Sequence, residues 1–238
     1  MSSYQGTSVP SQIHLALGPP NALVAAWVGG RASTLTYWPA QEPHQKRIAT
    51  GKHTAHSLLM YLATYLIDPP VGLPTTSLDE LQRLIDVARQ WARDPTTGSR
   101  PAELTPPALQ LRLDALADYR LPSMYYNSPL LHAVTIPNLA HGTTYEYRVD
   151  GDSRTFAFTT PPPRGGGYPF TMGLAADVGQ TAVSAANIHF LRAVLAAHTG
   201  SVCLIAGDLA YADGYYPLWD SFGRMLEPLA ARVPLLTT

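Results

Sequence analysis

Two apolar segments that each end in an aspartate constrain the fold of this chain more than any other feature. "YPFTMGLAAD" ends at Asp177 and "SVCLIAGD" ends at Asp208. Between them Ile188, Leu191 and Leu195 recur at helical spacing. Apolar strands on either side of a helix are typical of a parallel β-α-β unit. The two carboxylates are therefore expected at one edge of one sheet, where open α/β sheets bind their ligands.

The chain before residue 160 has an antiparallel pattern instead. Tyr145, Tyr147 and Val149 alternate with polar neighbours, as one face of a half-buried sheet requires. Further short apolar runs bounded by turn residues predict strands at Gln12–Gly18, Ala22–Gly30, Ser33–Pro39 and Leu130–Leu139. The stretch "PPPRGGG", residues 161–167, follows these runs and predicts a linker between two domains.

Residues from about 53 to 120 interrupt the β pattern with helical spacing. Ser77 and Glu80 form a capping-box pattern that starts a predicted helix over Ser77–Arg93. A second predicted helix, Pro106–Asp118, begins with proline at its first turn. We expect both helices to form an insertion in a loop of the β domain, because a longer loop adds only a logarithmic closure cost.

Composition excludes several classes of protein. Hydrophobic residues make up 46% of the 238 residues and charged residues 14%, which is typical of a globular chain rather than a disordered one. The net charge of -1 provides no basic surface for nucleic acid, so we expect no nucleic-acid partner. The longest nearly apolar run, Leu58–Ile67, is too short to span a bilayer, so no membrane partner is expected. The single cysteine, Cys203, excludes an internal disulfide.

Asp177, Asp208 and Tyr211 form the candidate site. Gly179 and Gly207 flank the aspartates, and glycine permits a tight exit from a strand and a close ligand approach. Carboxylate and phenol oxygens together suit a hard cation. Ordinary turns, a phosphoryl-aspartate domain or a Rossmann-like domain could also place aspartates here. The absence of Gly-x-Gly-x-x-Gly and Gly-x-Ser-x-Gly disfavours a dinucleotide site and a serine hydrolase.

Other candidate ligands have weaker patterns. His53 and His56 are one helical turn apart, but no third ligand lies near them in the sequence, so we interpret them as structural. Residues 204–224 crowd aromatic and acidic side chains after the second apolar segment, and we expect a loop there. In that loop Tyr215, Tyr216 and Trp219 are interpreted as packing or pocket-wall residues.

The motifs "ADVGQT", "AGDLAYAD" and "WDSFGR" resemble those of the plant-type purple acid phosphatases, which are calcineurin-like dinuclear metallophosphoesterases. Upstream, "PSQIHLALG", "LVAAWV" and "YNSPLLHAVTIPNLAHGTTYEYRV" resemble the β-sandwich of the same family. The resemblance implies a fibronectin type III-like β-sandwich over residues 8–160, with a helical insertion at about 53–120. It implies that residues 168–238 are the beginning of an α/β metallophosphoesterase domain, truncated in this chain.

The resemblance also implies a role for each candidate residue. Asp177 would bind Fe(III), Asp208 would bridge the two metals, and Tyr211 would bind Fe(III) as a phenolate. The second metal would be a divalent ion: Zn, Mn or Fe. The protein would hydrolyse small phosphate monoesters at acid pH, with no further catalytic or cofactor-binding residue in this chain. The family's Asn and His ligands would lie beyond Thr238, so we expect an incomplete and inactive portion of the enzyme.

Two alternative functions remain open on the sequence. A non-catalytic binding or adhesion protein would use the β-sandwich and retain a vestigial phosphoesterase segment. A phosphodiesterase of the same superfamily is disfavoured by Tyr211, since relatives of that kind commonly have aspartate at this position. The family is mostly secreted, but the first residues show no signal-peptide pattern, so localisation stays open. The oligomeric state also stays open.

Overall fold

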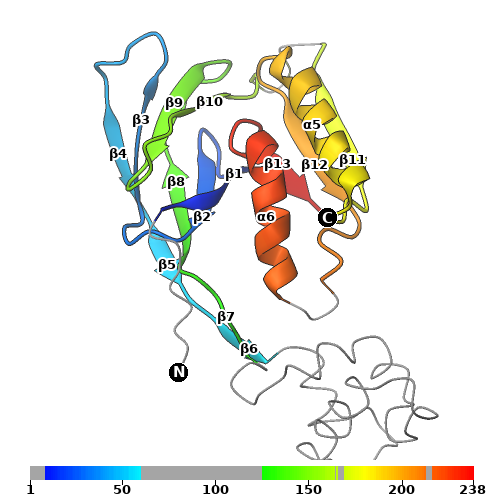
Figure 1. Ribbon diagram of the computed structural model, residues 1–238. Helices are drawn as coiled ribbons and strands as arrows, with labels where there is room; N and C mark the ends of the chain where they lie inside the picture. The colour runs from blue at the N-terminus through cyan, green and yellow to red at the C-terminus, as the bar shows by residue number, and fades with distance from the viewer. Residues whose placement is uncertain (1–8, 60–124, 164, 166–168, 213–215) are drawn as a thin grey trace, which may run out of the picture. The chain divides into compact units, whose positions relative to one another are not determined.

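The computed structural model describes residues 9–59, 125–163, 165, 169–212 and 216–238 (Figure 1). The predicted helices Ser77–Arg93 and Pro106–Asp118 lie outside the described residues, so the helical insertion stays a prediction. The chain divides into two compact units, and one of them comprises Ser3–His56, Ser128–Ala212 and Pro217–Thr238. All the elements discussed below belong to this unit except the hairpin of β6 and β7, which belongs to the other.

Among the described residues, more lie in strands than in helices. The strands are β1 (Ser11–Leu17), β2 (Leu23–Val28), β3 (Thr34–Pro39), β4 (Arg47–Thr50), β5 (Lys52–Thr54), β6 (Ser57–Leu59), β7 (Tyr125–Asn127), β8 (Leu131–Ile136), β9 (Thr144–Val149), β10 (Phe156–Thr159), β11 (Met172–Ala176), β12 (Val202–Ala206) and β13 (Leu235–Thr237). The helices are α5 (Ala182–Ala196) and α6 (Pro217–Ala230). Neither helix is long and apolar enough to cross a membrane.

A seven-stranded sheet runs through the compact unit in the order β11-β12-β13-β1-β2-β8-β5. The predicted β-α-β unit is confirmed, because β11 and β12 are parallel neighbours and α5 lies between them in sequence. β13 is parallel to β12 and joins β1 at the pair Ala16↔Leu235. The sheet therefore continues across the predicted linker, although the division into two domains stays a prediction.

The first core lies between this sheet and a four-stranded sheet in the order β10-β9-β3-β4. Both sheets contribute fully buried side chains, including Trp27 from β2, Leu35 from β3 and Tyr147 from β9. The alternation predicted for Tyr145, Tyr147 and Val149 is confirmed, since all three are buried. Two sheets over one core fit the predicted sandwich, and its fibronectin type III-like identity stays a prediction.

The second core forms around the parallel strands. Ile188 and Leu195 of α5 pack with Cys203 and Ile205 of β12, as the helical spacing predicts. The opposite face of β11 is open, because Met172 and Leu174 have exposed fractions of 52% and 67%. Helix α5 therefore covers one face of the parallel strands, and the other face of β11 is exposed.

Helix α6 replaces the loop that we expected after β12. It begins at Pro217, a residue well suited to the first position of a helix. Phe222, Leu226 and Leu229 are buried at helical spacing, and they join the second core. Trp219 therefore belongs to a helix rather than a loop, and its exposed fraction is 43%. The loop interpretation was wrong from Pro217 onward because Pro, Gly and Asp obscured this apolar stripe.

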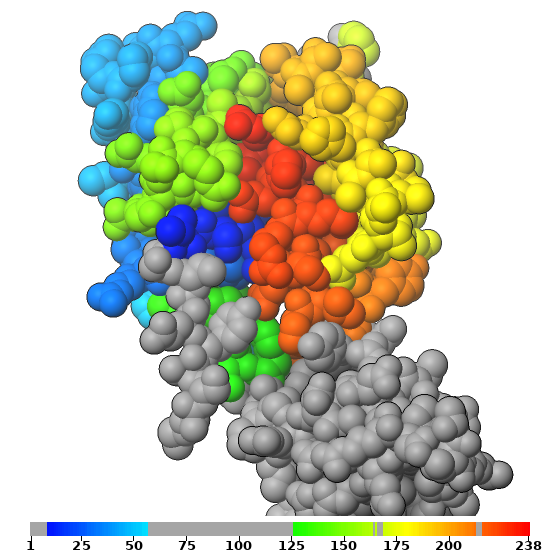
Figure 2. Space-filling model, viewed as in Figure 1, coloured from blue at the N-terminus to red at the C-terminus, as the bar shows by residue number. Residues whose placement is uncertain are grey.

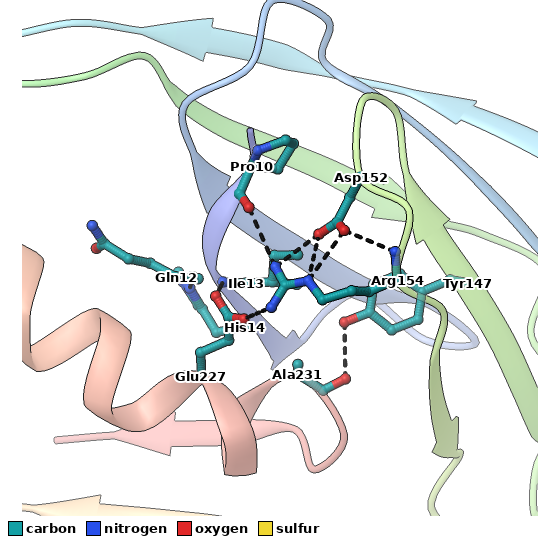
Figure 3. A network of polar contacts seen from close by, with 9 residues as sticks. All are labelled: Pro10, Gln12, Ile13, His14, Tyr147, Asp152, Arg154, Glu227 and Ala231. Atoms are coloured by element: carbon teal, nitrogen blue, oxygen red, sulfur yellow. Dashed lines mark hydrogen bonds and ion pairs between the residues drawn. The ribbon is translucent and has the colours of Figure 1, made fainter. Parts of the chain in front are cut away.

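Helix α6 also connects the two cores. It packs against β1 and α5, and the space-filling view shows its residues between them (Figure 2). The side chain of Glu227 accepts a hydrogen bond from the Ile13 backbone N–H at 3.1 Å and pairs with the Arg154 guanidinium (Figure 3). Arg154 also forms an ion pair with Asp152 at 2.8 Å, and the Tyr147 hydroxyl donates to the Ala231 carbonyl at 2.8 Å. These contacts, here called the α6 network, join β1 and the β9–β10 region to helix α6 and the residue that follows it.

Candidate metal centre

Asp177 and Asp208 meet at the carboxyl ends of β11 and β12. The register pairs Ala176 with Ala206, so each aspartate lies just beyond the end of its strand. The backbone N–H of Asp177 donates to the Ala206 carbonyl at 3.2 Å, and that of Asp208 donates to Asp177 Oδ1 at 3.1 Å. Both aspartates are exposed. The structure thus brings the two predicted carboxylates together at one edge of the sheet.

The backbone at this edge has a left-handed conformation at Asp177, Tyr211 and the two flanking glycines. Asp177 has φ 48°, Tyr211 has φ 46° and Gly207 has φ 75°. Glycine adopts such angles without penalty, but side-chain-bearing residues held there cost of order ~1–3 kcal/mol each. A Cβ atom at Gly207 would lie 2.6 Å from Asp177 Oδ1, so a side chain there would displace the carboxylate. Backbone strain of this kind is concentrated at functional sites.

Tyr211 is held at the surface between two buried alanines. Ala210 and Ala212 have exposed fractions of 3% and 7% and belong to the second core, whereas Tyr211 has an exposed fraction of 47%. The Tyr211 ring lies over Gly179, where a Cβ atom would approach Cδ2 of the ring to 3.3 Å. Small residues on both sides therefore fix the ring position while the phenol stays accessible. Asp177, Asp208 and Tyr211 together are here called the strand-end rim.

The electrostatics of the rim favour a cation. Desolvation, then the negative charges of Asp177 and Asp208, and finally a hydrogen bond with the Asp208 side chain raise the pKa of the Tyr211 phenol above its ordinary value of 10.0. Two carboxylates close to a phenol therefore keep it protonated in the absence of a compensating positive charge. A bound cation would neutralise the carboxylates and reverse that effect.

A hollow of about 430 Å³ borders the rim. Asp177 and Tyr211 line it, and so does the first turn of α5, including Thr181 and Ser184. Thr181 caps the helix, since its hydroxyl accepts from the Ser184 backbone N–H at 3.1 Å. The positive end of the helix dipole thus lies beside the hollow, and such a helix end favours anions.

The donor set fits a hard metal ion. Two carboxylates and a phenol supply only oxygen atoms, which hard cations prefer. Among the described residues, no group of three or more His, Cys, Asp or Glu side chains gathers to hold a metal. The metal-binding role of the three residues therefore stays a prediction that their chemistry supports.

The histidines that sequence reasoning set aside have structural contacts. His53 lies in β5 rather than in a helix, so the one-turn spacing to His56 does not place the two on one helical face. Nδ1 of His53 and Nδ1 of His132 each contact the Ser33 hydroxyl, at 3.1 and 2.9 Å. His132 is buried, and its ring stacks on Trp27 at a centroid distance of 5.1 Å. Sequence reasoning missed this cluster because the pairing of His53 with His132 across β5 and β8 carries no local signal.

Comparison with known proteins gives one consistent answer. Purple acid phosphatase 22 from Arabidopsis thaliana is 40% identical over 114 residues, which are 48% of this chain and 25% of that protein. A purple acid phosphatase from Glycine max is 38% identical over 119 residues, again 48% of this chain and 25% of its own length. The resemblance to plant purple acid phosphatases is confirmed. This chain spans about a quarter of the length of these relatives.

A solved structure supports the fold. Purple acid phosphatase PPD1 from yellow lupin seeds matches 97% of this chain and 35% of its own chain, with a TM-score of 0.58 and 16% sequence identity. A further Arabidopsis relative, 34% identical over 119 residues, is named an Fe(3+)-Zn(2+) purple acid phosphatase. No family model matches the chain.

Proposed function

We propose that this chain contributes metal ligands to an acid phosphatase that hydrolyses phosphate monoesters with a dinuclear, iron-containing centre. Asp177 binds Fe(III), Asp208 bridges the two metals, and Tyr211 binds Fe(III) as a phenolate. The second metal is a divalent ion, for which the Fe(3+)-Zn(2+) relative suggests zinc.

The left-handed backbone at Asp177 and Tyr211 is the observation that carries this proposal. Glycine, asparagine and aspartate tolerate such angles, but a tyrosine is strained there. Here the strained Tyr211 and the neighbouring Asp177 are both exposed, and both carry oxygen atoms at the ends of parallel strands. Ligand binding would explain why the protein keeps this strained backbone. Packing does not explain it, because both side chains are exposed.

The residues around the rim suit a phosphate ester. Asp177 and Asp208 bind the cations, and the Tyr211 hydroxyl releases its proton to the surrounding water when it becomes a ligand. A bound metal pair supplies the positive charge that polarises a phosphate ester and lowers the pKa of water. The first turn of α5, beside the hollow, favours the negative phosphoryl group.

Ferric ion titration into the metal-free protein tests the assignment. A phenolate-to-iron absorption band in the visible range should appear in the wild type and be absent in Tyr211→Phe, because a phenyl ring donates no oxygen. Tyr216→Phe is the matched control: this residue lies five positions on, and its ring contacts Tyr126 at a centroid distance of 5.9 Å. It should retain the band. Absence of the band in the wild type, or its persistence in Tyr211→Phe, contradicts the proposed function.

Substitution of the bridging carboxylate gives a second readout. Asp208→Asn removes the charge that two cations share, so iron should bind more weakly to this variant.

A further inference from the structure

Gln180 makes side-chain contacts with two segments beside the rim. Its Nε2 donates to the Ala210 carbonyl at 2.9 Å, and its Oε1 accepts from the Ser221 hydroxyl. A carbonyl only accepts hydrogen bonds, so the contact with Ala210 fixes which end of the amide faces the loop. The half-buried Gln180 side chain therefore connects the loop before Tyr211 to helix α6.

These contacts complete a ladder that continues beyond the strands. The Val178 backbone N–H donates to the Asp208 carbonyl at 3.1 Å, and the Gly179 N–H donates to the Leu209 carbonyl at 2.8 Å. The next carbonyl along the loop is that of Ala210, and it receives the Gln180 side chain in place of a backbone N–H. Gln180 is thus the last rung before the left-handed residue Tyr211.

The hydrogen bond from Ser221 of α6 restrains the Gln180 side chain. Helix α6 is anchored on β1 and α5 and carries the buried residues Phe222 and Leu226. The Ser221 hydroxyl, on the same helix, holds Gln180 Oε1 and has the Leu218 carbonyl as its alternative acceptor at 3.1 Å. A flexible glutamine side chain is thereby restrained at both ends of its amide, so it can transmit the position of the helix to the loop.

We propose that Gln180 is a positioning residue, which holds the Tyr211 loop in its left-handed, metal-accepting conformation by bridging it to Ser221 of α6. The metal-accepting role of the loop rests on the proposed function. The bridge from Ala210 through Gln180 to Ser221 can be tested without a metal. When the bridge is removed, the loop is free to leave its strained backbone angle, and the phenol leaves the two carboxylates.

Amide hydrogen exchange on the metal-free protein tests the bridge. Gln180→Met keeps the length of the side chain and removes both hydrogen bonds. The Val178 and Gly179 amides, whose acceptors belong to the loop, should exchange about tenfold faster in this variant, as expected for the loss of a bond to a buried carbonyl. Ser221→Ala leaves the bond to Ala210, so its effect should be smaller, and the double variant should exchange no faster than Gln180→Met. Asn187→Ala, an exposed position on α5 that lines the same hollow, is the control and should leave both amides unchanged.

Ferric titration then tests the purpose of the bridge. In Gln180→Met the phenolate-to-iron band should require at least about tenfold more iron, since the competent loop conformation is less populated. Unchanged exchange at Val178 and Gly179 overturns the bridge. Faster exchange with an unchanged iron titration overturns its positioning role. If the wild type shows no band at all, the proposed function fails, and the exchange experiment alone decides whether Gln180 holds the loop.

Discussion

The Gln12 region and the strand-end rim both hold residues other than glycine in left-handed backbone, and they offset the cost differently. In the α6 network region, Gln12 has φ 57°, is 8% exposed, and donates from Nε2 to the buried Asp220 carboxylate at 3.1 Å. At the strand-end rim, Asp177 and Tyr211 have similar angles, but their side chains are exposed. Burial and a hydrogen bond compensate the strain at Gln12. At the rim, the hydrogen bond from the Asp208 N–H to Asp177 Oδ1 is exposed, and the Tyr211 ring is half exposed, so less compensates the strain there, and we take it as a sign of a ligand.

The largest expected effect comes from breaking the α6 network at Arg154. In Arg154→Ala, the side chains of Asp152 and Glu227, with exposed fractions of 2% and 12%, lose their common cation. Arg154 itself is 46% exposed, so solvent screens part of the loss, and the free energy of unfolding should fall by about 2 kcal/mol in urea denaturation. Arg148→Ala, at an exposed position on the neighbouring strand β9, is the control and should change it by less than about 0.5 kcal/mol. An equal loss of unfolding free energy in Arg154→Ala and Arg148→Ala would contradict a special stabilising role for the α6 network.

A pair of identical substitutions compares the two regions directly. Tyr147→Phe removes the hydroxyl that bonds the Ala231 carbonyl inside the protein, and we expect a loss of about 1–2 kcal/mol. Tyr211→Phe removes a hydroxyl from a half-exposed ring, and the free energy of unfolding of the metal-free protein should change by less than about 0.5 kcal/mol. Thermal or urea unfolding of both variants measures the difference. A larger loss at Tyr211 than at Tyr147 would mean that the rim is structural.

The smallest expected effect is a dependence of stability on pH that originates in the first core. Burial, and then the neighbouring charge of His53, lower the pKa of His132 below its ordinary value of 6.5. The unfolded chain therefore binds this proton more readily than the folded protein does, and protons favour unfolding. The contribution of His132 to the free energy of unfolding should be fully present above pH 6.5. It should be lost as the pH falls through the lowered pKa of the folded protein.

Unfolding free energies measured across this pH range, for the wild type and His132→Gln, test the assignment. The groups that face His132 are His53 on β5, the Ser33 hydroxyl, the Trp27 ring on β2 and the Gly29 backbone, whose hydrogen bond acts on the His132 pKa in the opposite direction. The variant should show a shallower slope, whereas Tyr211→Phe should keep the slope of the wild type. An unchanged slope in His132→Gln assigns the pH dependence to other groups.

Local patterns sufficed to predict the parts of the fold whose neighbours are close in sequence. The alternation over Tyr145–Val149 and the helical spacing from Ile188 to Leu195 each report one buried face, and both predictions are confirmed. The meeting of Asp177 and Asp208 also followed from sequence, because parallel strands around one helix end at the same sheet edge. The apolar stripe of α6 was present as well, but the crowded aromatic and acidic side chains of this stretch were interpreted as a loop.

The remaining features depend on contacts that no local pattern records. The junction of β1 with β13, the Gln180 bridge and the pairing of His53 with His132 each join residues that lie far apart in sequence. The left-handed angles at Asp177 and Tyr211 could not be predicted either, because neither residue type indicates such an angle as strongly as glycine does. Only the flanking glycines, Gly179 and Gly207, hinted at an unusual backbone.

The single pair Ala16↔Leu235 has a consequence for the order of events during synthesis on the ribosome. β1 is followed at once by its neighbour β2, whereas its other neighbour, β13, emerges only after residues 18–234 have been translated. Until then one edge of β1 stays unpaired, and an open edge invites association with other chains. Contacts between such distant residues also form slowly. The nascent protein is therefore expected to need protection at β1, and a chaperone that binds extended segments would find its target there.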